Sequence, residues 1–169
     1  GVSPVEAIAA LKRFPGVHRR QEVKGEAYGC VVIDDFAHHP TAIRETIAGV
    51  RAKYRGRRLV AVLEPRSNTM KLGTMKDQLA GALAGADEVC CYAGRGVAWS
   101  PEAALEPLGA RAWVTHDFDA LVEQVVADAK PGDVILCMSN GGFGGIHGKL
   151  LAGLSEKAAR VGGFESERD

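Results

Sequence analysis

The sequence predicts an α/β protein with a doubly wound, mostly parallel, Rossmann-like sheet and an antiparallel strand at one edge. Short runs of β-branched and other apolar residues recur at residues 29–34, 59–63, 88–92, 112–115 and 134–138. The segments between these runs have apolar residues spaced by three or four positions, which is the period of an amphipathic helix. Alternating strands and helices are typical of parallel strands joined by helical crossovers.

The N-terminal residues predict a capped helix followed by a hairpin. Ser3 is a good N-cap, Pro4 suits the first helical position, and Glu6 can reach back to Ser3, so a helix should run from here to residue 13. Residues 18–24 and 29–34 then flank Gly25-Glu26-Ala27-Tyr28, a pattern that predicts a hairpin whose second strand enters the core.

The remaining elements follow from caps and breakers. A helix should begin at Pro40, and Asp117 should cap another, while Pro131-Gly132-Asp133 turns the chain into the last strand. Other helices are expected after the polar loop 64–71 through about residue 83, over residues 101–105, and from residue 146. The sequence therefore predicts one domain over residues 1–161 and a disordered tail over residues 162–169.

Composition excludes several classes of function. Lys plus Arg and Asp plus Glu both number 21, so no global field favours nucleic acid. No apolar run reaches the roughly 20 residues needed to span a bilayer, so no membrane partner is expected. The basic cluster at residues 53–58 is interpreted as a solvated turn. Four cysteines lie in or beside predicted strands without a chelating spacing, which favours reduced core thiols in a cytoplasmic protein and no metal site.

Three loops at predicted strand ends carry the polar side chains. If the sheet is parallel, loops 34–39, 64–71 and 139–145 lie at the same edge, where open α/β sheets bind ligands. Together they contain carboxylates, imidazoles, cations and amides, a mixture that suits an anionic, hydroxyl-rich ligand such as a nucleotide. The alternatives are structural: acids that cap a turn, an internal ion pair in loop 64–71, and glycines that permit a tight turn.

Common nucleotide-hydrolysis motifs are absent. Counting back from Gly148-Lys149, Phe143 stands where a Walker A motif needs its first glycine, and Leu150 replaces the magnesium-binding Ser or Thr. No G-x-G-x-x-G follows a strand, and no catalytic triad spacing is present. We interpret His147 as an interface residue rather than a ligand.

Three segments are similar to a known family. Segment 34–41 (DDFAHHPT) resembles the strand-end signature in the C-terminal domain of Mur ligases, the ATP-dependent amide-forming ligases of peptidoglycan synthesis. Segments 64–71 (EPRSNTMK) and 138–147 (MSNGGFGGIH) are most similar to the member that attaches L-alanyl-γ-D-glutamyl-meso-diaminopimelate to UDP-N-acetylmuramate. The resemblance covers about residues 3–157.

The resemblance implies that one wall of an ATP site lies at this edge. Asp34, Asp35, His38 and Asn140 would bind the nucleotide, with Asp35 at the ribose. His38 and His39 would lie near the phosphates or an acyl-phosphate intermediate.

The resemblance also implies catalytic and substrate-binding roles. His38, His39 and Arg66 would take part in catalysis. The residues expected to contact substrate are Arg66, Ser67, Asn68 and Lys71.

Mur ligases have two further domains that this chain lacks. The central one carries the P-loop and most ligands of Mg²⁺, so the chain alone should be inactive and should depend on both domains as partners. UDP-N-acetylmuramate and the tripeptide are the expected substrates. The alternatives are the C-terminal domain of the ligase that adds L-alanine to UDP-N-acetylmuramate, a folylpolyglutamate synthetase branch, and a stand-alone nucleotide- or peptide-binding module.

Overall fold

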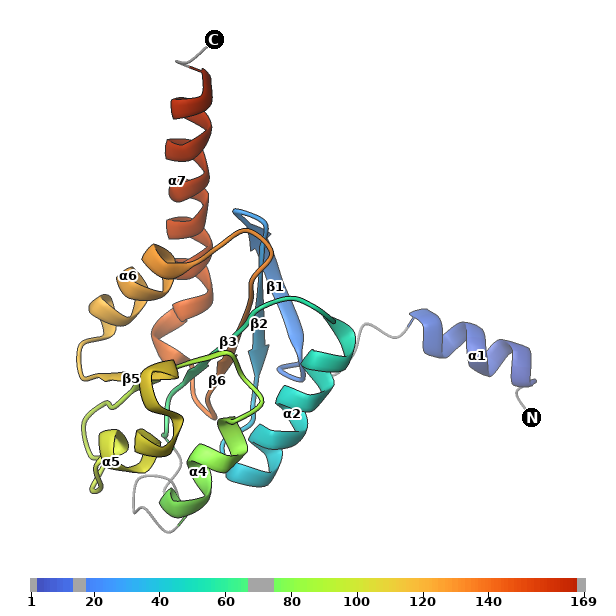
Figure 1. The fold of residues 1–169 in the computed structure, drawn as a ribbon. Helices are drawn as coiled ribbons and strands as arrows, with labels where there is room; N and C mark the ends of the chain where they lie inside the picture. Colours follow the sequence, from blue (N-terminus) through green and yellow to red (C-terminus); the bar gives the residue numbers. More distant parts are fainter. Residues whose placement is uncertain (1–2, 14–17, 67–74, 167–169) are drawn as a thin grey trace.

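The computed structural model describes residues 3–13, 18–66 and 75–166 (Figure 1). The six strands among these residues form one sheet in the order β1-β2-β6-β3-β4-β5. Their bounds are β1 Glu22–Ala27, β2 Cys30–Asp35, β3 Leu59–Leu63, β4 Glu88–Tyr92, β5 Ala112–Thr115 and β6 Val134–Met138. The β1–β2 pair is antiparallel and every other pair is parallel, which confirms the predicted fold class.

Helices cover both faces of the sheet. Their bounds are α1 Pro4–Arg13, α2 Pro40–Lys53, α4 Lys76–Leu83, α5 Pro101–Leu105, α6 Phe118–Asp128 and α7 Ile146–Ser166, with short 3₁₀ segments at Glu106–Arg111 and Phe143–Gly145. The apolar sides of α2, α4 and α5 pack in one buried cluster, and those of α6 and α7 pack in another. The sheet separates the two clusters, as expected for a doubly wound fold.

Successive strand residues alternate between the two clusters. Val31 and Val32 belong to different clusters, as do the neighbouring Cys90 and Cys91. This alternation follows from the two-residue period of a strand. It explains why every residue of the central strands β2, β3 and β6 is buried without polar alternation, whereas the edge strand β5 is half-buried.

The hairpin differs from its prediction in register. Tyr28 and Gly29 have φ values of 52° and 70°, so the turn is a two-residue turn at 28–29 rather than the predicted 25–28. The first strand starts at Glu22 instead of residue 18. The reason is local backbone geometry, because Arg19 and Gln21 have φ values of 56° and 45°, which a strand cannot contain.

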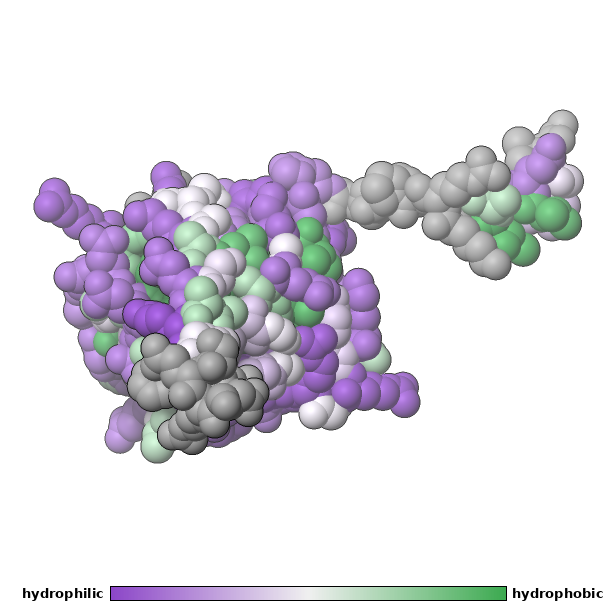
Figure 2. All heavy atoms as spheres, turned by 90° about the horizontal axis from the view of Figure 1, so that it is seen from above, coloured by the Kyte–Doolittle hydropathy of each residue, from purple (hydrophilic) through white to green (hydrophobic). Residues whose placement is uncertain are grey.

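The ends of the chain also differ from the prediction in part. The capping box is confirmed, since the Ser3 amide donates to Glu6 Oε2 at 3.0 Å and the Glu6 amide donates to Ser3 Oγ at 3.3 Å. Figure 1 shows α1 apart from the sheet, and Figure 2 shows apolar side chains on its surface. At the other end, α7 continues to Ser166, past residue 162 where a disordered tail was expected. Residues 167–169 lie outside the described residues.

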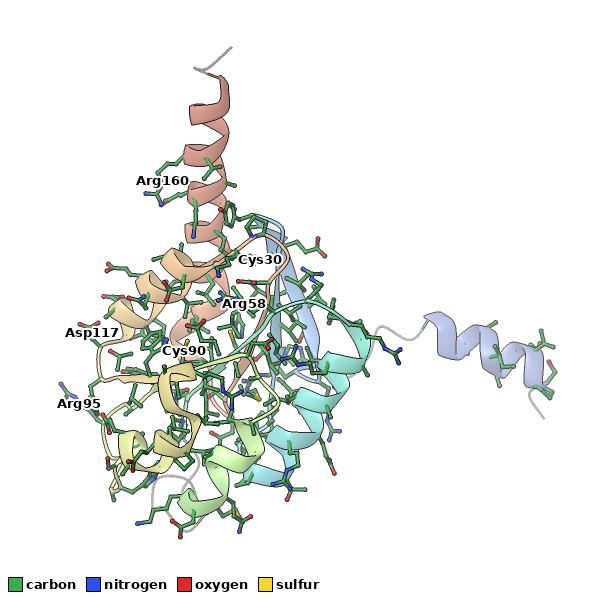
Figure 3. The ribbon with its side chains drawn as sticks, viewed as in Figure 1. Cys30, Arg58, Cys90, Arg95, Asp117 and Arg160 are labelled. Atoms are coloured by element: carbon green, nitrogen blue, oxygen red, sulfur yellow. The ribbon has the colours of Figure 1, made fainter. Side chains whose placement is uncertain are left out.

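Arg57 and Arg58 form hydrogen bonds between the segments at the edge of the sheet where the parallel strands begin. Arg58 donates to both carboxylate oxygens of the buried Asp133, at 3.1 and 2.8 Å. Arg57 donates to the carbonyl groups of Gly29, Gly132 and Asp133. Figure 3 shows Arg58 and Cys30 at this end of the sheet. The interpretation of this basic cluster as a solvated turn is therefore wrong for Arg57 and Arg58, which are partly buried structural residues.

Candidate functional site

The candidate site lies where β2, β6 and β3 end. Asp35 of β2 pairs with Met138 of β6, which pairs in turn with Leu63 of β3, so the three strands end at one level. The Ser139 amide donates to the carbonyl of Asp35 at 3.2 Å, and the Glu64 amide donates to that of Met138 at 3.0 Å. The predicted convergence of the three strand ends is confirmed, with β6 between the other two strands; residues 67–71 of the second loop lie outside the described residues.

Asp35 is a buried carboxylate beside a pocket. It is 5% exposed, and its Oδ1 atom accepts hydrogen bonds from the Ala37 amide at 2.8 Å and from Thr46 Oγ1 at 3.3 Å. Its Oδ2 atom accepts one from the Gln21 amide at 2.9 Å. A carboxylate offers about four acceptor positions, so the pocket-lining Asp35 has room for one further donor.

Asp34 has a different environment. Its Oδ2 atom accepts from Arg19 Nε at 3.0 Å, and its Oδ1 atom lies 3.1 Å from His147 Nε2, which has no hydrogen-bond partner among the described residues. Asp34 is 5% exposed and is not among the residues that line the pocket. Desolvation lowers the pKa of His147, against the opposing charge of Asp34. His147 therefore lies at the interface of α7 and β2, in agreement with its interpretation from sequence.

The two histidines of the first loop line the same pocket but have different ring tautomers. Nδ1 of His38 lies 2.8 Å from the carbonyl oxygen of Phe36, which can only accept, so Nδ1 carries the proton. Nδ1 of His39 caps α2 by accepting from the Ala42 amide at 3.4 Å, so in the neutral ring Nε2 carries the proton. In neutral His38, Nε2 is therefore a hydrogen-bond acceptor, whereas in neutral His39 it is a donor.

The second half of the site surrounds the glycine-rich loop. Ser139 Oγ donates to Glu64 Oε2 at 2.6 Å and accepts from the Gly141 amide at 3.0 Å. The exposed Arg66 passes over Gly141 so closely that a Cβ atom there would lie 2.5 Å from Arg66 Cδ. Asn140 Oδ1 is buried without a hydrogen-bond donor among the described residues. The predicted site residues Ser67, Asn68 and Lys71 lie outside the described residues.

The sequence analysis missed two arginines at this edge. Arg20 lines the pocket together with Asp35, His38 and His39, and the pocket has a volume of about 1070 Å³, which is large enough for a nucleotide. Arg19 donates to Asp34 and to the carbonyl groups of Ser139 and Gly141. The predicted antiparallel hairpin could have indicated both arginines, because residues that precede β1 must lie beside residues that follow β2.

The described residues contain no group of three or more His, Cys, Asp or Glu side chains that could hold a metal ion. The four free cysteines are all buried. Burial raises the pKa of the Cys91 thiol to about 12 and raises those of Cys90 and Cys137 further. Within the described ranges, no helix is long and apolar enough to cross a membrane.

The fold and this edge define a doubly wound α/β domain with a polar pocket beside the end of β2. The family described as "Mur ligase, glutamate ligase domain" matches residues 19–141, and the chain belongs to this family.

Individual relatives are consistent with this assignment. The UDP-N-acetylmuramate–L-alanyl-γ-D-glutamyl-meso-2,6-diaminoheptandioate ligase of Escherichia coli is 52% identical over 159 residues, which cover 94% of this chain and 35% of the relative. The chain thus spans about a third of the length of such relatives.

Two solved structures are similar in fold and sequence. A murein peptide ligase from Psychrobacter arcticus has a TM-score of 0.75 and 42% identity, covering 92% of this chain and 34% of that chain. A domain assigned to a ligase for UDP-N-acetylmuramate and the same tripeptide, from Haemophilus ducreyi, has a TM-score of 0.70 and 47% identity, covering 80% of this chain and 99% of that one.

Proposed function

We propose that this chain is the C-terminal domain of an ATP-dependent ligase that joins L-alanyl-γ-D-glutamyl-meso-diaminopimelate to UDP-N-acetylmuramate, in the cytoplasm. The observation that carries the proposal is the 52% identity, across 94% of the chain, to the E. coli ligase named for this reaction. The geometry supports it independently, because the pocket beside the end of β2 is lined by acids, imidazoles and a guanidinium.

The pocket residues fit one side of a bound ATP molecule. Asp35 has an acceptor position for a ribose hydroxyl, since only three donors contact its carboxylate. Arg20 supplies a forked donor that matches phosphate, and His39 supplies an Nε2 donor in its neutral tautomer. The role of Asp34 is indirect in this proposal, because Arg19 donates to one of its oxygens and His147 lies against the other.

The glycine-rich side would receive the peptide. Arg66 is exposed beside Gly141 and can pair with a substrate carboxylate. Asn140 Oδ1 needs a donor, because an unsatisfied buried acceptor costs about 1–3 kcal/mol. An amine of the incoming peptide is such a donor. Ser67, Asn68 and Lys71 remain proposed substrate contacts.

The rest of the enzyme must supply what this chain lacks. No Walker A motif occurs in the sequence, and the described residues contain no acidic cluster for Mg²⁺. Both would come from the remaining two thirds of the relatives' length. The chemistry of the family is phosphorylation of the acceptor carboxylate by ATP, followed by attack of the peptide amine. This domain would contribute by closing over the nucleotide, excluding water and aligning the amine.

The test uses the full-length enzyme. His38→Ala, Arg20→Ala and Arg66→Ala should each lower kcat/KM for ligation at least about tenfold, or about 1.4 kcal/mol of transition-state stabilisation. His116→Ala is the matched control, since this exposed histidine contacts Glu102 rather than the site. The His116→Ala enzyme should ligate at the wild-type rate. Normal turnover in all three site variants would refute the proposed site.

Substrate competition tests the identity of the amine. The full-length enzyme should form an amide and ADP with the tripeptide and not with L-alanine. Ligation of L-alanine alone would favour the alternative ligase. The isolated chain should not hydrolyse ATP, and measurable hydrolysis by the purified chain would support an independent module.

A further inference from the structure

Arg19 contacts two of the three loops of the site at once. Its Nε atom donates to Asp34 Oδ2 at 3.0 Å, and its Nη2 atom donates to the carbonyls of Ser139 and Gly141, each at 2.7 Å. Its guanidinium also lies 5.2 Å from the centre of the Phe36 ring. The side chain is only 20% exposed, so water competes weakly for these contacts.

The backbone of Arg19 is held as firmly as its side chain. Its φ is 56°, which a non-glycine residue adopts only when its surroundings impose it. Its carbonyl accepts from the Phe36 amide at 2.8 Å, and its amide donates to Glu22 Oε2 at 2.9 Å. The neighbouring Arg20 lines the pocket, and the Gln21 amide donates to Asp35.

These contacts continue to Arg66 through one glycine. Arg19 binds the carbonyl of Gly141, while the Arg66 side chain passes over the Gly141 α-carbon, where it leaves no room for a Cβ atom. The position of Gly141 therefore determines the path of Arg66. Asn140 lies between the two carbonyls that Arg19 binds, so its placement depends on the same contacts.

We infer that Arg19 is a positioning residue, which sets the glycine-rich loop with Asn140 and Arg66 against the β2 end with Asp35 and His38. The inference deepens the proposed function and rests on it, because it assigns one side to ATP and the other to the peptide amine. Arg19 itself contacts neither substrate in this scheme. Its effect is to hold the two reactants in line, which lowers the barrier rather than the binding constants.

A purely structural role is the competing explanation, and Arg57 provides the matched control. Arg57 also donates from Nε to one partner and from Nη2 to two carbonyls, and its guanidinium lies 5.4 Å from the Tyr54 ring centre. It does so at the opposite edge of the sheet. Lysine preserves the charge but lacks the forked set of donors, so Arg→Lys removes the same geometry at both positions.

The experiment compares Arg19→Lys, Arg19→Gln and Arg57→Lys at a temperature where all are folded. In the full-length enzyme, the two Arg19 variants should lose at least about tenfold in kcat, with KM for ATP within about threefold of wild type. Arg57→Lys should keep kcat within about twofold, whatever its loss of stability. The second readout is the ¹H–¹⁵N spectrum of this chain alone, which is feasible because the similar H. ducreyi domain was crystallised as a separate domain. The Asn140 and Gly141 amide signals should shift in the Arg19 variants and not in Arg57→Lys.

The outcomes separate the two claims. Unchanged Asn140 and Gly141 signals in both Arg19 variants, or a kcat equal to that of Arg57→Lys, would overturn the role of Arg19. A full-length wild-type enzyme that ligates no tripeptide would overturn the proposed function instead. In that case the amide signals still decide whether Arg19 positions the loop.

Discussion

Replacing Lys157 by Met should destabilise the domain measurably, because this side chain caps the end of α6. Its Nζ atom donates to the carbonyls of Val126, Ala127 and Ala129, at 2.8, 2.7 and 2.8 Å. The ammonium also lies 5.0 Å from the centre of the Tyr28 ring. A cation at a helix C-terminus contributes up to about 2 kcal/mol when it is partly buried. Methionine keeps the apolar stem but cannot donate, so the three carbonyls lose this donor and, among the described residues, only Val126 keeps another, the Ala129 amide.

We therefore expect Lys157→Met to lower the free energy of unfolding by about 2 kcal/mol. For a chain of 169 residues, this loss corresponds to a Tm about 4–8 °C lower. The assay is thermal unfolding of the isolated chain, followed by circular dichroism. Lys149→Met is the control on the same helix, since its Nζ lies 3.9 Å from Asp119 with both side chains at least half exposed, and such pairs contribute only about 0–1 kcal/mol. Equal melting temperatures for the two variants would refute the assignment of Lys157 as a helix cap.

Three further predictions follow from the site and the core. Because burial lowers the pKa of His147, this residue binds a proton more readily in the unfolded chain, and stability should fall as the pH falls from about 6.5 through the folded pKa. Urea unfolding at pH 7.5 and 5.5 should show a smaller loss of stability for His147→Gln than for the wild type. An equal loss would contradict the assignment. Gly141→Ala should displace Arg66 and lower the rate of ligation while leaving Tm nearly unchanged; ligation kinetics and a thermal melting curve measure the two effects. A ligation rate equal to that of the wild type would show that Arg66 tolerates the displacement. Burial raises the pKa of the Cys91 thiol to about 12, and the other three thiols are also buried. A thiol reagent should therefore label none of the four cysteines in the folded chain and all four in denaturant. Labelling without denaturant would show an accessible thiol.

The local sequence determined most of the secondary structure, because the relevant forces act over a few residues. The bounds of β3, β4, β5 and β6 agree with the apolar runs in the sequence. Asp117 caps α6 as its residue type predicts, accepting from the Ala120 amide at 3.0 Å. The start of the first hairpin strand could not be predicted, since no glycine or proline separates residues 18–21 from the strand, yet Arg19 and Gln21 adopt left-handed backbone.

The sequence also predicted some features of the candidate site, and only the tertiary structure showed the others. Residue types at the strand ends indicated which loops carry polar side chains, and the resemblance of their motifs indicated the family. Only the tertiary structure placed β6 between β2 and β3, and this strand order brings Asp35, Glu64 and Ser139 to one edge. It alone showed that Asp34 pairs with Arg19 while Asp35 faces the pocket. The physical reason is that a contact between residues 19 and 141 depends on strand order and hairpin register, which no short stretch of sequence encodes.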